Sequence, residues 1–149
     1  MSTPAEPLLD RLRRRTDWRL TAQRRVIAEA FEGEHVHLTA EEILARARRR
    51  MPEISLATVY NALNELVALG ELRPVHAGGR PRYDPTSRPH DHLVCIQCGT
   101  IHDVYGRGRV ALPRAQRFGH RIVGQETIFK GYCPDCGGIE RARRAPQAR

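Results

Sequence analysis

The chain lacks the features that would place it in or across a membrane. None of its apolar runs reaches roughly 18 residues, the length expected of a membrane-spanning helix. The first 20 residues carry too many charges for a secretory signal peptide. Aromatic residues are few, with three Phe and one Trp among 149 residues. These absences predict a cytoplasmic protein of one or two small domains, with no membrane partner.

Cysteine is also scarce, and its spacing is the most specific signal in the sequence. The four cysteines form two CxxC pairs, Cys95 with Cys98 and Cys133 with Cys136. In the cytoplasm such pairs are typical of metal ligands rather than of disulfides. Two CxxC turns complete the tetrahedron of a closed structural zinc site. A rubredoxin-like iron centre and a redox-active CxxC are the alternatives, although a thioredoxin-like enzyme needs only one pair.

Positive charge exceeds negative charge along the whole chain. The formal net charge is +8 and the isoelectric point is about 10.2. Such an excess indicates a polyanionic partner, with nucleic acid as the first candidate. The excess is spread over both halves, so charge alone does not locate a DNA-binding face. The basic segment 141–149 is predicted to be a disordered tail.

Apolar residues recur at helical spacing in the first 70 residues. A leucine-rich stretch at 8–12 predicts a first helix, and Thr21 is a typical N-cap for a second, over 22–31. Thr39 begins a capping box for a third helix, over 41–51, which Pro52 ends. On their own, paired helices of this kind would favour an ordinary helical hairpin.

A fourth predicted helix, capped by Ser55, completes a helix-turn-helix with the third. As a recognition helix in a major groove it would present Thr58, Tyr60 and Asn61 to DNA. Two strand-like stretches then flank Ala77-Gly78-Gly79 and predict a β-hairpin. Helices followed by a hairpin are the order of a winged helix, with Arg80 on or near the wing and available to phosphates.

The second half of the chain predicts a small α/β domain. Strands are expected at 92–96 and 100–104, a short or irregular helix at 107–118, and a last strand over 121–123 and 127–130. His90 and His92 would share one face of the first strand, because alternate side chains point to opposite faces. Two imidazoles on one face make a fair metal pair, although surface histidines would show the same pattern.

Four stretches carry a resemblance to a known family. They are Arg19-Leu-Thr with Gln23-Arg24, the segment HLTAEE at 37–42, SLATVYNAL at 55–63, and HDHLVCIQCG at 90–99. Through them the sequence resembles the ferric uptake regulator family over nearly its whole length. The resemblance implies an α+β chain that acts as a homodimer and represses genes when a regulatory metal is bound. It implies a regulator and not an enzyme.

The fold expected from this resemblance has two domains. An N-terminal winged helix-turn-helix DNA-binding domain is assigned to 1–83 and a hinge to 84–89. A small α/β dimerisation domain with the four-cysteine zinc site is assigned to 90–140, followed by the basic tail. Pro89, Pro113 and Gln125 depart from the family pattern, and they bear on further metal sites and on the dimerisation helix.

Within the family, the sequence most resembles the peroxide-responsive branch. Its regulatory site of three His and two Asp falls on the residues His37, Asp84, His90, His92 and Asp103. Iron sensors usually carry Glu where this chain has Asp103, and Tyr60-Asn61 also resembles the peroxide branch. This resemblance implies Fe(II) or Mn(II) at the regulatory site, with peroxide oxidising a ligand histidine. On residue type alone, a lone loop histidine such as His37 is usually solvated.

The predicted partner is double-stranded DNA with a palindromic, A/T-rich operator. Tyr60 is the candidate for thymine methyls and Asn61 for base edges or phosphate. Arg19 is a candidate for the minor groove, where narrow A·T tracts attract arginine. Simple phosphate contact is an equally good interpretation for Arg19 and Arg24. Two alternatives stay open at this point. One is an iron- or manganese-responsive repressor without peroxide sensing, and the other is a cytosolic CxxC thiol oxidoreductase.

Overall fold

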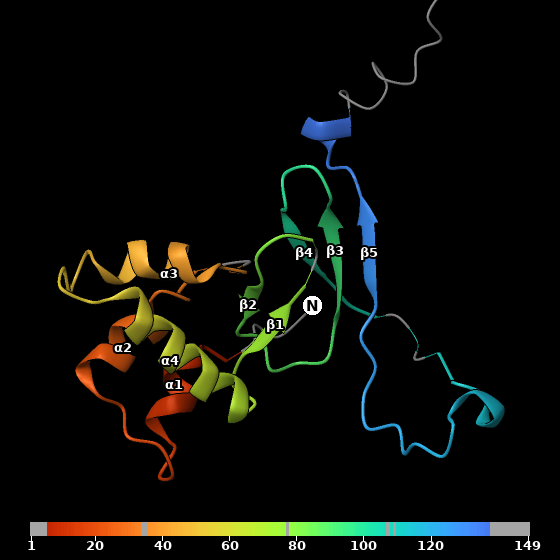
Figure 1. Ribbon diagram of the computed structural model, residues 1–149, viewed down its shortest axis with the longest axis horizontal. Helices are drawn as coiled ribbons and strands as arrows, with labels where there is room; N and C mark the ends of the chain where they lie inside the picture. The colour runs from red at the N-terminus through yellow and green to blue at the C-terminus, as the bar shows by residue number, and fades with distance from the viewer. Residues whose placement is uncertain (1–5, 34–35, 77, 107, 109, 138–149) are drawn as a thin grey trace, which may run out of the picture. The chain divides into compact units, whose positions relative to one another are not determined.

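The computed structural model describes residues 6–33, 36–76, 78–106, 108 and 110–137. The chain divides into two compact units, with the boundary between Arg88 and Pro89. Helices dominate the first unit and strands the second (Figure 1). Within the described ranges, no helix is both long and apolar enough to cross a bilayer. The predicted tail at 141–149 and Ala77 of the predicted turn lie outside the described residues.

The first unit contains four α-helices, which are α1 (Leu8–Arg13), α2 (Ala22–Glu29), α3 (Ala40–Ala47) and α4 (Leu56–Ala68). The predicted N-caps form, because Thr21, Thr39 and Ser55 each accept a hydrogen bond from the backbone N–H three residues on. At α3 the capping box is reciprocal, since the Glu42 carboxylate also accepts from the Thr39 N–H at 2.8 Å.

Two helices end sooner than the sequence indicated. α2 ends at Glu29 and α3 at Ala47, rather than at 31 and 51. The chain after α3 continues in tighter turns, in which the Arg50 N–H donates to the Ala47 carbonyl at 3.1 Å. Pro52 disfavours helical backbone only at Met51, the residue before it, so it does not account for the end of α3 at Ala47.

One apolar core holds the four helices together. Ile27 of α2, Ile43 of α3 and Leu63 of α4 are all fully buried, and Trp18 joins them at 9% exposure. Each helix therefore turns one stripe inward, as the helical spacing predicted. Tyr60 of α4 packs against this core with part of its ring, so it is not wholly turned to solvent.

The predicted wing is present as a two-stranded antiparallel sheet. Strand β1 (Arg73–Val75) pairs with β2 (Arg82–Asp84), with Val75 opposite Arg82. The connection includes Gly78 and Gly79, whose φ values of +88° and +87° are open to glycine at little cost. β2 has a second neighbour that the sequence did not indicate, since Leu38 and Tyr83 form an antiparallel bridge.

The second unit is built on a three-stranded sheet of order β4-β3-β5 (Figure 1). β3 (Asp91–Cys95) runs antiparallel to β4 (Ile101–Val104) and parallel to β5 (Ile128–Gly131). His92 and Val94 are buried while Leu93 is 42% exposed, the alternation expected of a sheet with one covered face.

The connection between β4 and β5 differs from the prediction. In its described residues the expected helix at 107–118 is reduced to a 3-10 turn, η1 (Arg114–Gln116), and the expected strand at 121–123 is absent. Gly106, Gly108 and Pro113 interrupt helical hydrogen bonding there. Large apolar side chains on this connection stay exposed, with Phe118 at 85% and Val123 at 83%.

Candidate metal centres and DNA-binding surface

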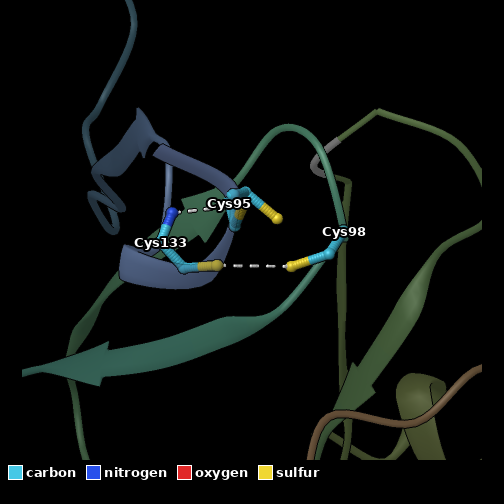
Figure 2. A group of neighbouring side chains, drawn as sticks. Cys95, Cys98 and Cys133 are labelled. Atoms are coloured by element: carbon cyan, nitrogen blue, oxygen red, sulfur yellow. Dashed lines mark hydrogen bonds between the residues drawn. The ribbon is translucent and has the colours of Figure 1, made fainter. Parts of the chain in front are cut away.

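Sheet pairing brings the two cysteine pairs together. Cys95 ends β3 and Cys98 lies in the turn toward β4, while Cys133 and Cys136 follow β5. The parallel register sets Cys95 opposite Gly131, so both pairs emerge at the same end of the sheet. All four Sγ atoms lie within 4.8 Å of one another. Figure 2 shows Cys95, Cys98 and Cys133 facing one another across this cluster.

The sulfur spacing fits a tetrahedral zinc site. Four thiolates at a Zn–S distance of about 2.3 Å define a tetrahedron with edges of about 3.8 Å. The Cys98 and Cys133 Sγ atoms are 3.8 Å apart (Figure 2). The Cys133 backbone N–H donates to the Cys95 sulfur at 3.4 Å, and Gly99 follows the first pair with a φ of +74°. None of these four cysteines forms a disulfide.

The acidities of the thiols also favour a cation among them. Backbone N–H groups of Cys133 and Cys98 lower the pKa of Cys95 to about 6, which favours its thiolate. The hydrogen bond of Cys136 with the Cys133 sulfur, together with burial, raises the pKa of Cys136 to about 12. The raised pKa of Cys136 shows that a neighbouring thiolate disfavours a second negative charge, and a divalent cation bound among the four sulfurs would supply the neutralising charge.

In the first unit, His37 and Asp84 form one polar pair. The backbone bridge between Leu38 and Tyr83 sets the preceding and following residues side by side, so His37 Nε2 lies 3.9 Å from Asp84 Oδ1. Both residues are buried, at 7% and 1% exposure. The reading of His37 as a solvated loop histidine is therefore wrong. Arg82 anchors this segment by donating to the His37 carbonyl at 2.8 Å.

In the second unit, His90, His92 and Asp103 form another cluster. His90 and His92 are both buried on one face, and their Nε2 atoms are 3.0 Å apart. Asp103 lies opposite His92 across the β3–β4 ladder, and its Oδ1 is 3.4 Å from His90 Nε2. The Tyr105 hydroxyl donates to the other Asp103 oxygen at 3.0 Å. Two imidazole nitrogens and a carboxylate thus face one another on a rigid sheet.

One acidic residue beside this cluster was missed by sequence reasoning. Glu126 Oε1 lies 2.8 Å from His92 Nδ1, the ring nitrogen turned away from His90. The parallel pairing places residue 126 there, because the His92 N–H donates to the Thr127 carbonyl at 3.0 Å. No local motif signals a contact made by parallel strands 34 positions apart, since His92 and Glu126 meet only through the sheet.

The proposed DNA-contacting side chains all belong to the first unit. Asn61 on α4 and Arg19 before α2 are exposed, and the Thr58 hydroxyl lies 2.9 Å from that of Ser55. Arg80 on the wing is 70% exposed and pairs with Glu41 of α3. Arg24 differs from the others, because its guanidinium faces Trp18 and Glu65 within the unit.

Residues 15–111 match the Ferric uptake regulator family. The chain belongs to this family. It is 33% identical over 137 residues to the transcriptional regulator FurA of Mycobacterium tuberculosis, covering 89% of this chain and 92% of that protein. It is 30% identical over 128 residues to the peroxide operon regulator of Bacillus subtilis, covering 84% and 88% respectively.

The solved structures agree on the fold. The ferric uptake regulator of Helicobacter pylori superposes with a TM-score of 0.65 over 87% of this chain and 91% of that chain, at 22% identity. This likeness confirms the α+β fold, with a winged helix followed by a smaller domain that carries the four-cysteine cluster. Members of the family are metal-binding transcription regulators that bind DNA as dimers, and they are not enzymes. The protein is therefore a metal-responsive transcription regulator.

Proposed function

We propose that this regulator is a repressor that senses hydrogen peroxide through Fe(II)-catalysed oxidation of a ligand histidine. The observation that carries the proposal is the cluster of His90, His92 and Asp103, with an aspartate and not a glutamate 3.4 Å from His90. A second observation is the buried pair of His37 and Asp84 in the other unit. Together these five side chains supply three imidazoles and two carboxylates.

The donor chemistry of this set fits Fe(II) or Mn(II). Mixed nitrogen and oxygen ligands suit these ions, whereas the all-sulfur set suits zinc. We assign the regulatory ion to the five histidines and aspartates, and a structural zinc to Cys95, Cys98, Cys133 and Cys136. Zinc would also bind the regulatory ligands tightly, so selectivity in the cell depends on geometry and metal supply.

We propose that the regulatory metal takes ligands from both sides of a hinge at 84–89. His37 belongs to the DNA-binding half, at 1–83, while His90, His92 and Asp103 belong to the dimerisation half, at 90–140. One ion that binds all of them selects a closed arrangement of the halves. The gain in DNA affinity is then limited by the difference in metal affinity between the closed and open arrangements.

Bound Fe(II) supplies a redox couple that reacts with peroxide, which Zn(II) lacks. In the net reaction an imidazole C–H of His37 or His90 gains one oxygen atom. The ring loses two electrons, and hydrogen peroxide is reduced by two electrons to water. The oxidised ring is a poorer ligand, so the two halves lose their common anchor and the operator is released.

On DNA, a homodimer of this chain would meet a palindromic, A/T-rich operator. α4 enters the major groove, where Tyr60 meets thymine methyls and Asn61 meets base edges or phosphate, with Thr58 at the start of the helix. Arg19 reaches the minor groove and Arg80 contacts phosphate. The ion pair between Arg80 and Glu41 would then exchange for a phosphate contact.

The deciding experiment compares operator binding by the Fe(II)-loaded and Mn(II)-loaded protein before and after dilute peroxide. We expect only the iron form to lose operator binding, and only its tryptic peptide with His37 or His90 to gain 16 Da, the mass of one oxygen. The Asp103→Glu variant should show less oxidation and keep metal-dependent binding, because one methylene displaces the carboxylate. Loss of binding through cysteine oxidation and zinc release would refute the histidine mechanism.

A second candidate is an iron- or manganese-responsive repressor without peroxide sensing. It is favoured by the likeness to the ferric uptake regulation protein of Bacillus subtilis, because that identity of 31% is as high as the 30% identity to the peroxide operon regulator of the same organism. In this case both metal forms would keep operator binding after peroxide, and no histidine would gain mass. The same experiment therefore separates the two candidates.

A further inference from the structure

The loop between α1 and α2 is fastened to α4 by three side chains, Trp18, Arg24 and Glu65, which we call the Trp18 cluster. The indole Nε1–H of Trp18 donates to Glu65 Oε2 at 3.0 Å, and the Arg24 guanidinium pairs with the same carboxylate oxygen. The guanidinium carbon of Arg24 lies 4.6 Å from the centroid of the Trp18 ring. The Glu65 carboxylate thus binds both the Trp18 indole and the Arg24 guanidinium, and the guanidinium stacks on the indole.

Arg24 makes a further contact that links the Trp18 cluster to the backbone of Arg19. One terminal nitrogen of its guanidinium binds Glu65, while the other donates to the backbone carbonyl of Arg19 at 2.8 Å. The Arg24 side chain is only 25% exposed. A phosphate contact through either terminal nitrogen of Arg24 would therefore compete with its ion pair to Glu65 or with its hydrogen bond to the Arg19 carbonyl.

Arg19 itself is exposed, and its backbone is held on both sides. Its carbonyl also accepts from the Thr21 N–H at 3.1 Å, and Thr21 is the N-cap of α2. Trp18, the residue before Arg19, is buried at 9% exposure and bonded to α4. The Arg19 side chain therefore projects from a segment whose place relative to α4 is fixed by the Trp18 cluster.

We infer that Arg24 is a positioning residue for DNA recognition and not a phosphate contact. Through the Arg19 carbonyl, and with Glu65 and Trp18 as its supports, it sets where the Arg19 side chain meets DNA while α4 occupies the major groove. This inference rests on the proposed role of Arg19 in DNA binding. It replaces the sequence-based assignment of Arg24 to phosphate.

The two roles of Arg24 predict different responses to conservative changes. A phosphate contact survives Arg24→Lys, because lysine keeps the charge. A positioning role does not, because lysine cannot bind Glu65 and the Arg19 carbonyl with two nitrogens of one planar fork. Glu65→Gln separates the two roles of Arg24 by the direction in which DNA affinity changes. If Glu65 merely holds Arg24 away from phosphate, removing its charge strengthens DNA binding, whereas loss of positioning weakens it.

The test uses the full-length Mn(II)-loaded protein and a palindromic duplex selected from a random library by the wild-type protein. Fluorescence anisotropy gives the Kd over a range of salt concentrations, and Arg25→Ala on the exposed neighbouring position is the matched control for loss of one positive charge. We expect Arg24→Ala and Arg24→Lys each to weaken binding on the order of tenfold, close to the loss from Arg19→Ala. The double variant Arg19→Ala/Arg24→Ala should lose little more than Arg19→Ala alone.

The salt dependence and the flanking sequence provide readouts that loss of stability alone would not move. A phosphate contact by Arg24 would lower the slope of log K against log salt by about 0.9, whether or not Arg19 is present. We expect instead that the slope of Arg24→Lys equals that of Arg19→Ala, and that both variants lose the preference for A·T over G·C at the flanks. Thermal unfolding followed by Trp18 fluorescence checks that each variant is folded in the assay.

Three results would overturn the inference. They are wild-type affinity for Arg24→Lys, tighter binding with a steeper salt slope for Glu65→Gln, and additive losses in the double variant. If Arg24→Ala fails to fold, Arg24→Lys and Glu65→Gln decide the matter by themselves. An Arg19→Ala variant with wild-type affinity would also overturn it, together with the proposed role of Arg19, while leaving peroxide sensing intact.

Discussion

Glu71 provides a test of what holds the first unit together. Its carboxylate accepts from Arg11 Nε at 2.9 Å and from Arg15 at 2.7 Å, which ties α1 to the chain after α4. The side chains of Glu71 and Arg11 are 13% and 11% exposed, and Arg11 also donates to the Pro85 carbonyl at 2.8 Å. Glu71→Gln keeps the shape of the side chain and leaves the mostly buried Arg11 guanidinium without its counter-charge, while Arg15 keeps its ion pair with Asp17 at 2.6 Å.

The expected loss of unfolding free energy in Glu71→Gln lies between two known limits. Exposed ion pairs contribute about 0–1 kcal/mol, while breaking a buried pair by removing one partner costs about 3–5 kcal/mol. Because Arg11 and Glu71 are mostly buried but Arg15 is 24% exposed, we expect about 2–3 kcal/mol for Glu71→Gln. The exposed pair of Arg13 and Asp10 is the control, and Asp10→Asn should cost less than about 0.5 kcal/mol.

The pH dependence of this loss has a definite sign. Burial alone would raise the pKa of Glu71, but the hydrogen bonds and charges of Arg11 and Arg15 outweigh burial and hold it below the ordinary value of 4.5. A carboxyl whose pKa is lowered by folding stabilises the folded state above its unfolded pKa. The difference in unfolding free energy between wild type and Glu71→Gln should thus be largest above pH 4.5 and shrink as the pH falls below it.

Urea unfolding followed by Trp18 fluorescence measures these differences, because the single Trp lies in the core of the first unit. If Glu71→Gln lowers the unfolding free energy by no more than Asp10→Asn does, the ion pairs of Glu71 do not stabilise the first unit as argued. The same conclusion would follow from a difference between wild type and Glu71→Gln that grows on acidification.

Other perturbations probe the zinc cluster and the DNA surface. Cys133→Ser should release one zinc per chain, measured by metal analysis, and unfold or monomerise the C-terminal half, because structural zinc contributes directly to folding; a stable dimer with full zinc would contradict the assignment. Tyr60→Ala should cost roughly 1–3 kcal/mol on the specific operator and little on random DNA. Arg80→Ala should weaken binding to both DNAs alike and flatten the salt dependence, and a loss confined to the operator would argue against phosphate contact.

The sequence predicts the parts of the fold that depend on neighbours along the chain. The caps at Thr21, Thr39 and Ser55 form as predicted, since each needs only a side chain and a backbone N–H three residues away. The hairpin follows from its glycines in the same way. The irregular connection after β4 was expected in part, because Pro113 argues against a helix there.

Contacts between distant segments are what the sequence could not supply. The bridge between Leu38 and Tyr83 buries His37, which local reasoning had treated as a solvated loop residue. The assignment of His37 as a ligand came only from the family resemblance. In the same way, the ion pair of Arg24 with Glu65, 41 positions away, becomes visible only in the structure. Residue type gives the chemistry of a side chain, and tertiary contacts decide where that chemistry is used.

Glu126 also reaches the proposed regulatory site only through a tertiary contact. Its carboxylate lies 2.8 Å from His92 Nδ1, and we predict that this proximity selects the ring form with its proton on Nδ1, which would leave the Nε2 lone pair for a metal. Carboxylates placed in this way orient a ligand histidine, and their removal typically weakens metal binding by about 10–100-fold. Glu126→Gln should therefore weaken Mn(II) binding by such a factor and leave the zinc content unchanged.

The measurement is Mn(II) titration followed by electron paramagnetic resonance, with the exposed Glu32→Gln as the control for loss of one negative charge. Nitrogen-15 NMR of the metal-free protein should also show that His92 loses its preference for the Nδ1-protonated form. An unchanged Kd with an altered ring form would mean that His92 is no ligand, because the orientation of a true ligand must affect the affinity. An unchanged Kd and an unchanged ring form would mean that the contact with Glu126 has no influence on His92.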